Sequence, residues 1–188
     1  MCQNGLREVK DPSDIFLSRT HNPSSGSVII SCIEGTRALL VEVQALVTKS
    51  SFGMPGRKVS GVDHNRVTMI LAVLEKRTGL LLGGYDVFVN VVGGVKIEEP
   101  ATDLAIAIAI TSSFKDVAIP GNTIVIGELG LGGEVRGVSQ FDSRIKEAAR
   151  LGFENALVPK DNIKDFLRIE SLNMTEVSSL AEATDKIC

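Results

Sequence analysis

The stretch of the sequence best suited to chemistry is residues 97–113, IEEPATDLAIAIAITSS. Two acids and a proline precede an Ile/Ala run, and this pattern predicts a helix that is capped by Thr102 and buried on all sides. Backbone N–H groups at the start of such a helix can stabilise an oxyanion. A serine placed there, with a desolvated lysine to accept its proton, would form a Ser/Lys dyad for acyl transfer.

The hydroxyl groups of this stretch do not have the setting of such a nucleophile. Thr102 is expected to cap the helix, and no lysine is adjacent to activate it. Ser112 and Ser113 lie about three turns along the helix, too far from its N-terminal N–H groups. The helix start therefore has the architecture of a serine site without an evident serine.

Other site chemistries are less compatible with the sequence. It contains no GxxxxGK[ST] motif, and the glycines at 130, 132 and 133 do not have GxGxxG spacing, so ATP would have to bind elsewhere. His21 and His64 are the only histidines and lie far apart, so a metal site would need unrelated carboxylates. A Ser–His–Asp arrangement would have to use His64, a single loop histidine that is more simply solvated.

The composition is typical of one globular domain with an aliphatic core. Of the 188 residues, 44% are hydrophobic, 23% are charged and 4% are aromatic. The net charge of −3 means that a DNA partner would require a local basic patch. Cys2, Cys32 and Cys188 form no CxxC pair, which is typical of a reducing compartment. We expect no membrane span and no secretory signal.

The elements that would position residues 97–113 alternate between strands and helices. Hydrophobic periodicity predicts strands at 27–35, 39–47, 85–94 and 155–162, with two short strands within 122–138 joined by a glycine-rich turn. Helices are predicted at 66–79 (capped by Asp63 or Asn65), 102–112 and 141–153, with short ones at 163–169 and 179–187. Residues 49–65 are predicted to form a long exposed loop. The order predicts an α/β (α+β) sandwich with one core.

Residues 1–26 have the composition of a linker, because Pro, Ser, Asn and Gly are concentrated there. Only Ile15–Leu17 give this segment something to dock. We interpret it as a junction to a part of a larger protein, with an ordinary frayed terminus as the alternative. Residues 27–188 would then form the domain.

Several long runs, in one order, carry a resemblance to a known family. They are EGTRALLVEVQALV, GVDHNRVTMILAVLEKRTG, DVFVNVVGGVKIEEPATDLAIAIAI, GELGLGGEVRGV and RIKEAARLGFENALVPKDN. Residues 27–160 resemble the proteolytic domain of Lon proteases, and more closely the C-terminal Lon-like domain of RadA/Sms proteins. The resemblance implies the Lon proteolytic-domain-like (ribosomal protein S5 domain 2-like) two-layer sandwich. It also implies that residues 1–26 follow a missing RecA-like ATPase domain, which would hold ATP and Mg, with no cofactor in residues 27–188.

The resemblance also implies that the peptidase site is degenerate. Active Lon enzymes carry their serine in a Gly-Pro-Ser-Ala-Gly motif, and the matching position here is Ala101. The position of their lysine corresponds to Asp142, with Arg144 two residues later. A methyl group cannot attack a carbonyl, so we expect no catalysis by this chain. Two alternatives stay open, namely a peptidase that uses another nucleophile and a module that binds peptides or repair proteins through the relict groove.

RadA-like proteins resemble ring-forming, ATP-driven motors that promote branch migration, and this implies a homo-oligomer, as a hexamer, on single-stranded or branched DNA. A RecA-type recombinase is a further implied partner, and no membrane is. The expected location is the bacterial cytoplasm, with the plant mitochondrion or chloroplast as the alternative. Two groups of cations are the DNA-contacting candidates: Arg57, Lys58 and Arg66, and Arg144, Lys146 and Arg150. The alternative is that Arg57, Lys58 and the cations of the helix 141–153 are ordinary solvated charges, and that Arg66 pairs with an acid or a helix end.

Overall fold

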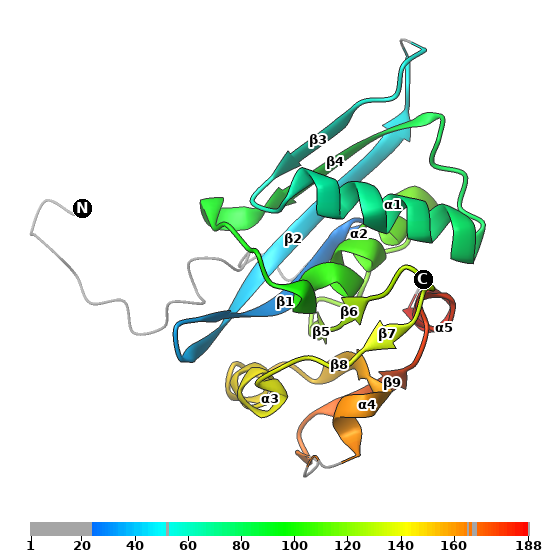
Figure 1. Cartoon of the computed structure of the whole chain (residues 1–188). Coiled ribbons are helices and arrows are strands. Elements are labelled where there is room, and N and C mark those ends of the chain that lie inside the picture. Colours follow the sequence, from blue (N-terminus) through cyan, green and yellow to red (C-terminus); the bar gives the residue numbers. More distant parts are fainter. Residues whose placement is uncertain (1–23, 52, 165, 167–168, 188) are drawn as a thin grey trace, which may run out of the picture.

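The structure, a computed structural model, describes residues 24–51, 53–164, 166 and 169–187. A seven-stranded mixed sheet of order β3-β4-β2-β1-β5-β8-β9 forms its centre (Figure 1). Its strands are β1 (Ser27–Glu34), β2 (Arg37–Lys49), β3 (Arg57–Ser60), β4 (Tyr85–Val91), β5 (Thr123–Val125), β8 (Asn155–Pro159) and β9 (Asn173–Val177). A separate antiparallel hairpin consists of β6 (Glu128–Leu129) and β7 (Val135–Arg136).

Five α-helices accompany the strands in the described residues. They are α1 (His64–Thr78), α2 (Asp103–Lys115), α3 (Phe141–Arg150), α4 (Lys160–Ile163) and α5 (Leu180–Ile187). The Asp63 carboxylate caps α1 by accepting from the N–H of Arg66 at 2.9 Å, and Gly79 ends it in the left-handed conformation, as the sequence predicts. None of the helices in these ranges is both long and apolar enough to cross a bilayer.

The sheet is antiparallel between β1, β2 and β4 and parallel in its other pairs. β1 and β2 form a hairpin around Gly35, whose φ is 62°, and β2 pairs antiparallel with β4. β5, β8 and β9 pair parallel on the other side of β1, through connections that contain helices. The β5–β8–β9 end of the sheet is therefore parallel, whereas the other end is antiparallel except for its edge strand β3, which pairs parallel with β4.

The two halves are covered differently. The larger apolar cluster joins α1, α2 and α5 to one face of the sheet, through residues such as Val43, Leu74 and Ile106. The second cluster places Phe141 and Ile145 of α3 against the opposite face. Over β1, β5 and β8 the sheet is therefore covered on both sides, and the α/β prediction is confirmed with a third layer at this end.

Helix α2 is the central element of the core (Figure 1). Every side chain from Asp103 to Ser112 is buried, as its Ile/Ala composition predicts. The small alanines let the helix lie close to both the sheet and α1. Because α2 is fixed on all sides, the position of its first turn is set by the core itself.

Three local predictions were wrong. Arg57–Ser60 lie in a strand within the predicted loop, because they pair parallel with β4 at the edge of the sheet. Residues 173–177 form the edge strand β9, which the sequence analysis missed. The short helix predicted at 163–169 is wrong, because α4 spans Lys160–Ile163 and overlaps that range only at Ile163.

The predicted linker lies mostly outside the described residues, as do His21, Cys2 and Cys188. Its last residues, Ser24–Gly26, are described, and Ser25 pairs with Ala118 in an isolated bridge.

Candidate functional site at the start of helix α2

The turn before α2 is held to the sheet by reciprocal backbone hydrogen bonds. Pro100–Thr102 form a 3-10 turn, with Pro100 at the position where a missing N–H costs nothing. Gly127 donates its N–H to the Ala101 carbonyl at 2.9 Å, and Leu104 donates to the Gly127 carbonyl at 3.0 Å. A Cβ on Gly127 would lie 3.0 Å from the Leu104 side chain, so glycine permits this close approach. Ala101 is consequently only 5% exposed.

A buried ion pair clamps this turn from the side of α3. The Arg144 guanidinium is 0% exposed and donates to both Glu99 oxygens, at 2.9 and 2.5 Å. It also donates to the carbonyls of Ser139, at 3.0 Å, and Ser31, at 2.5 Å. Glu99 accepts in addition from the N–H of Ile33 at 2.9 Å. Each charge is therefore paired and hydrogen-bonded, as burial requires.

A second ion pair clamps the same turn from the side of α1. The Arg66 guanidinium donates to both oxygens of the buried Asp103, with Nη2 at 2.6 Å from Oδ2. Asp103 Oδ2 also accepts from the N–H of Leu129 at 3.2 Å. The hydrogen bonds to Asp103 raise the pKa of Arg66 above its usual value. This pair connects α1, α2 and β6.

These contacts leave no activated nucleophile at the helix start. The Ala101 side chain is a methyl group, and the Asp142 carboxylate is exposed in the first turn of α3. The Thr102 hydroxyl is buried and donates to the Glu99 carbonyl at 3.0 Å, so Thr102 does not cap the helix with its side chain as predicted. Burial, and then the charge of Glu99, raise the pKa of the nearby Cys32 thiol to about 11, which keeps it protonated at neutral pH.

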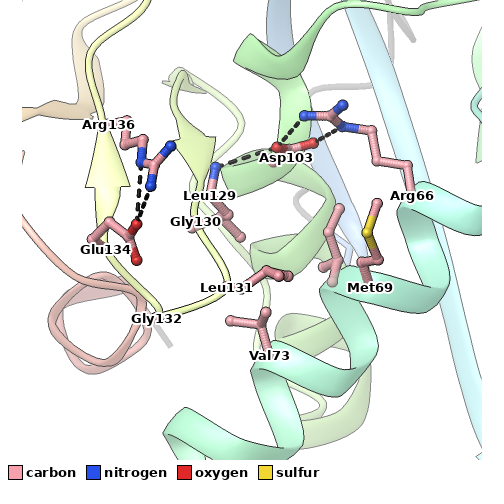
Figure 2. A pocket seen from close by; sticks show the side chains of 11 residues that line it. Arg66, Met69, Val73, Asp103, Leu129, Gly130, Leu131, Gly132, Glu134 and Arg136 are labelled. Carbon is pink, nitrogen blue, oxygen red and sulfur yellow. Dashed lines mark hydrogen bonds and ion pairs between the residues drawn. The ribbon is translucent and has the colours of Figure 1, made fainter.

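A cleft of about 500 Å³ opens beside the Arg66–Asp103 pair, between α1 and the β6–β7 hairpin (Figure 2). Its floor is apolar, and Met69 and Leu131 are 48% and 71% exposed. An exposed ion pair between Glu134 and Arg136 lines the side toward β7. In Figure 2 the Met69, Val73 and Leu131 side chains point into the space between the two ion pairs. The cleft is thus suited to an apolar group with polar flanks. No group of three His, Cys, Asp or Glu residues in the described ranges is placed to hold a metal ion.

The structure places the three residues of the first predicted DNA-contacting group in different surroundings. Arg57 donates to the carbonyls of Gly56 and Leu82, at 3.1 and 3.2 Å, and to that of Tyr85. Arg66 is occupied by Asp103, as the alternative interpretation predicts. Lys58 is exposed on β3, with its Nζ 5.9 Å from the centroid of the Phe88 ring. Of the three, Lys58 remains the best placed for a phosphate.

The residues of the second predicted group also differ in their surroundings. Arg144 is fully buried with its donors directed at Glu99 and backbone carbonyls, so it presents no surface for DNA in this conformation. Lys146 and Arg150 are exposed on α3, and Arg150 pairs with Glu147 at 2.7 Å. The inward side of α3 contains residues 141, 144, 145 and 148, and this i, i+3, i+4, i+7 spacing is the signal that places Arg144 inside.

The fold and the architecture at the start of α2 define a Lon-like α/β domain. The family described as "ChlI: Subunit ChlI of Mg-chelatase" matches residues 41–162, and the chain belongs to this family.

The chain is similar over almost its whole length to proteins named DNA repair protein RadA. It is 49% identical to the one from Bacillus subtilis over 183 residues, which are 97% of the chain and 40% of the relative. It is 46% identical to that from Halalkalibacterium halodurans over 185 residues, 98% of the chain and 40% of the relative. The protein from Synechocystis is 51% identical over 160 residues, 85% of the chain and 32% of the relative. The predicted resemblance to RadA is confirmed, and the chain spans less than half the length of these relatives.

Proposed function

We propose that this chain is a non-catalytic scaffold domain of a DNA repair protein, which joins subunits of a ring and offers them a DNA-contacting surface. The observation that carries the proposal is the start of α2. A Lon-like framework is kept there, while Ala101 stands at the nucleophile position and is closed in by Gly127 and by two ion pairs. The similarity to proteins named DNA repair protein RadA supports the part of the proposal that concerns DNA repair.

The ion pair Glu99–Arg144 supports a structural role for the former catalytic elements. In an active Lon enzyme, by the resemblance, the serine and the lysine would lie on the turn before α2 and on α3. Here the same two segments are joined by a salt bridge two residues from each of those positions. A clamp between the segments therefore occupies the place of a dyad.

The DNA-contacting surface is proposed on the face of the sheet that carries α3. Lys58 is paired in register with Phe88, and Phe88 with Leu46, so all three lie on the face opposite α1 and α2. Lys146 and Arg150 of α3 are exposed on the same side of the sheet. Cations at both ends of this face give phosphates two points of contact.

The proposal extends to the cofactors, partners and location of the whole protein, through the resemblance to RadA/Sms proteins. ATP and Mg would bind to an upstream RecA-like domain, and a RecA-type recombinase would be a partner on single-stranded or branched DNA. The protein would act in the bacterial cytoplasm, or in a plant mitochondrion or chloroplast if its source is a plant.

DNA contact is tested by measuring the binding of the chain to a fluorescent single-stranded oligonucleotide at several salt concentrations. The double variant Lys58→Ala/Lys146→Ala is expected to reduce affinity and to lower the salt dependence by about 0.7 logarithmic units per lost phosphate contact. Lys96→Ala is the matched control, because Lys96 is equally exposed but pairs with Glu98 on the connection that follows β4. Equal binding by both variants would place the DNA contact elsewhere.

Assembly is tested by light scattering of the chain, with and without the oligonucleotide, at two salt concentrations. Ring formation requires heterologous contacts, so the mass is expected to reach a closed multiple of the monomer. A monomer at high protein concentration that binds no DNA would refute the proposal.

A second candidate function is peptide recognition, which the cleft between α1 and the β6–β7 hairpin favours. Exposed Met69 and Leu131 give it an adaptable apolar floor. Pulldown of repair proteins with Met69→Ser/Leu131→Ser, against Leu81→Ser as the exposed-leucine control, separates this function from the scaffold. Loss of a partner only with the first variant would favour peptide recognition.

A further inference from the structure

Half of the central sheet has an open face that carries a row of one cation and two apolar side chains. Across β3, β4 and β2, Lys58, Phe88 and Leu46 are aligned in register on the face opposite α1 and α2. Leu46 is 58% exposed, and the Phe88 ring is half-buried. The second apolar cluster, which α3 builds, does not include either residue. Within the described residues, the Phe88 and Leu46 side chains of this row thus lack an apolar cover.

The open face is hollowed next to the place where the upstream chain arrives. A depression of about 270 Å³ is lined by Ser24–Ser27 together with Gln44, Leu46, Phe88 and Asn90. The arrival point is fixed, because the Gly26 N–H donates to Ser112 Oγ at 2.8 Å and the Gly26 carbonyl accepts from the N–H of Ala45 at 2.8 Å. The first described residues, Ser24–Gly26, therefore lie at the rim of this depression.

The upstream segment contains one apolar run that is long enough to cover the row. Ile15, Phe16 and Leu17 are the only three consecutive apolar residues among the first 26. Six residues lie between Leu17 and Ser24, so the seven Cα–Cα steps give a reach of roughly 25 Å. Leu46 lies two residues along β2 from Gln44, the partner of Ser27, which is about 7 Å. Asn22-Pro23 favours a turn that reverses the chain over this short distance.

We propose that Ile15–Leu17 dock on the open sheet face, with Phe16 against Phe88 and the aliphatic side chains against Leu46. Docking removes both apolar surfaces from water, and an aromatic pair adds edge-to-face attraction. The short tether gives the segment an effective concentration on the order of millimolar, which favours it over a second copy or a free partner. The docked segment fixes the direction in which the upstream chain leaves the domain.

The test is hydrogen–deuterium exchange of the amides of Ile15–Leu17 in the full 188-residue chain, without DNA. Their exchange is expected to be about tenfold slower in the wild type than in Leu46→Ser. Leu81→Ser, an exposed leucine on the connection between α1 and β4, is the control and is expected to behave as the wild type. Because Leu46 is exposed, the amides of β2 and β4 keep their protection and report that the variant is folded.

A second measurement identifies the contact. Nuclear Overhauser effects between the Phe16 ring and the Leu46 methyl groups are expected in the wild type. Unprotected amides at 15–17, or protection that Leu46→Ser does not change, would overturn the proposal. Protection that disappears on dilution would also overturn it, because the occupant would then be a second copy. The outcome does not depend on whether the domain contacts DNA.

Discussion

The two ion pairs at the start of α2 hold the same turn from opposite sides, in different surroundings. Arg144–Glu99 lies within the molecule, with the guanidinium fully buried and four acceptor contacts. Arg66–Asp103 lies at the edge of the cleft, where the acid is buried and the arginine is 27% exposed. The Arg144–Glu99 pair is part of the core, whereas the Arg66–Asp103 pair also forms part of the surface of the cleft.

The difference shows how one residue type fills two roles around the same turn. Burial of a charge is tolerated only with complete pairing, so Arg144 is committed to the fold. Partial exposure leaves Arg66 able to approach a ligand in the cleft while it still holds Asp103. The stability of the turn should therefore depend on the two pairs unequally.

The largest effect is expected for Arg144→Ala, which leaves the Glu99 carboxylate and two carbonyls without their donor. A loss of about 3–5 kcal/mol in the free energy of unfolding is expected by urea denaturation. Lys146→Ala, on the exposed side of the same helix, should change it by less than about 0.5 kcal/mol. The double variant Glu99→Leu/Arg144→Met should recover most of the loss. Equal effects of Arg144→Ala and Lys146→Ala would contradict a structural role for Arg144.

Arg66→Ala tests the partly exposed pair. Asp103 would keep only the N–H of Leu129, and a loss of about 2 kcal/mol is expected, smaller than for Arg144 because water reaches the site. Lys76→Ala, at the exposed end of the same helix, is the denaturation control. If Arg66→Ala costs as much as Arg144→Ala, the comparison between the two pairs fails.

Ala101→Ser, alone and with Asp142→Lys, tests whether the clamped turn still supports chemistry. A hydroxyl at this buried position is expected to cost about 1 kcal/mol and to create no peptidase activity. A serine-reactive phosphonate and casein cleavage are the measurements, with the wild type as reference. A covalent adduct at position 101 would show that the turn is still accessible, and an adduct on the wild type would reveal another nucleophile.

The smallest effect is expected for an exposed pair, Glu182–Lys186 on α5. Hydrogen bonds from Lys186 and from Ser178 lower the pKa of Glu182 from 4.5 to about 2. A depressed carboxylate pKa stabilises the fold above the usual pKa, and this stability is lost as the pH falls through the folded value. Glu182→Gln should lower stability by a few tenths of a kcal/mol at neutral pH, because solvent screens the pair. The difference from the wild type should vanish between pH 4.5 and about 2, and a difference that persists at the lower pH would exclude this cause.

The sequence predicts those elements whose signals are local. Helix α1 has an apolar stripe and both caps, and α2 has the composition of a fully buried helix. Strands β3 and β9 are missed because each is short, lies at an edge and is defined by pairing with a distant strand. Val59 is the one strongly apolar residue in β3, so nothing in the segment itself distinguishes it from a loop.

The same contrast between local signals and long-range contacts applies to the candidate site. The absence of a serine at position 101 is readable from the sequence through the resemblance. The partners of Arg66 and Arg144 are not, because Asp103 and Glu99 lie 37 and 45 residues away and only the tertiary fold brings them together. The inward spacing of position 144 on α3 is the one local sign that it is buried.

The place of β1 in the strand order has a mechanical consequence. β1 is the middle strand of the sheet, bonded to β2 on one side and to β5 on the other, and residues 1–23 enter the domain at its first residues. A pull on those residues along the strand acts in shear, so several backbone hydrogen bonds must break together. The same pull on an edge strand such as β3 would separate its bonds from one neighbour only. If an upstream domain moves this one, as proposed, the force would enter through a strand that is hydrogen-bonded on both sides.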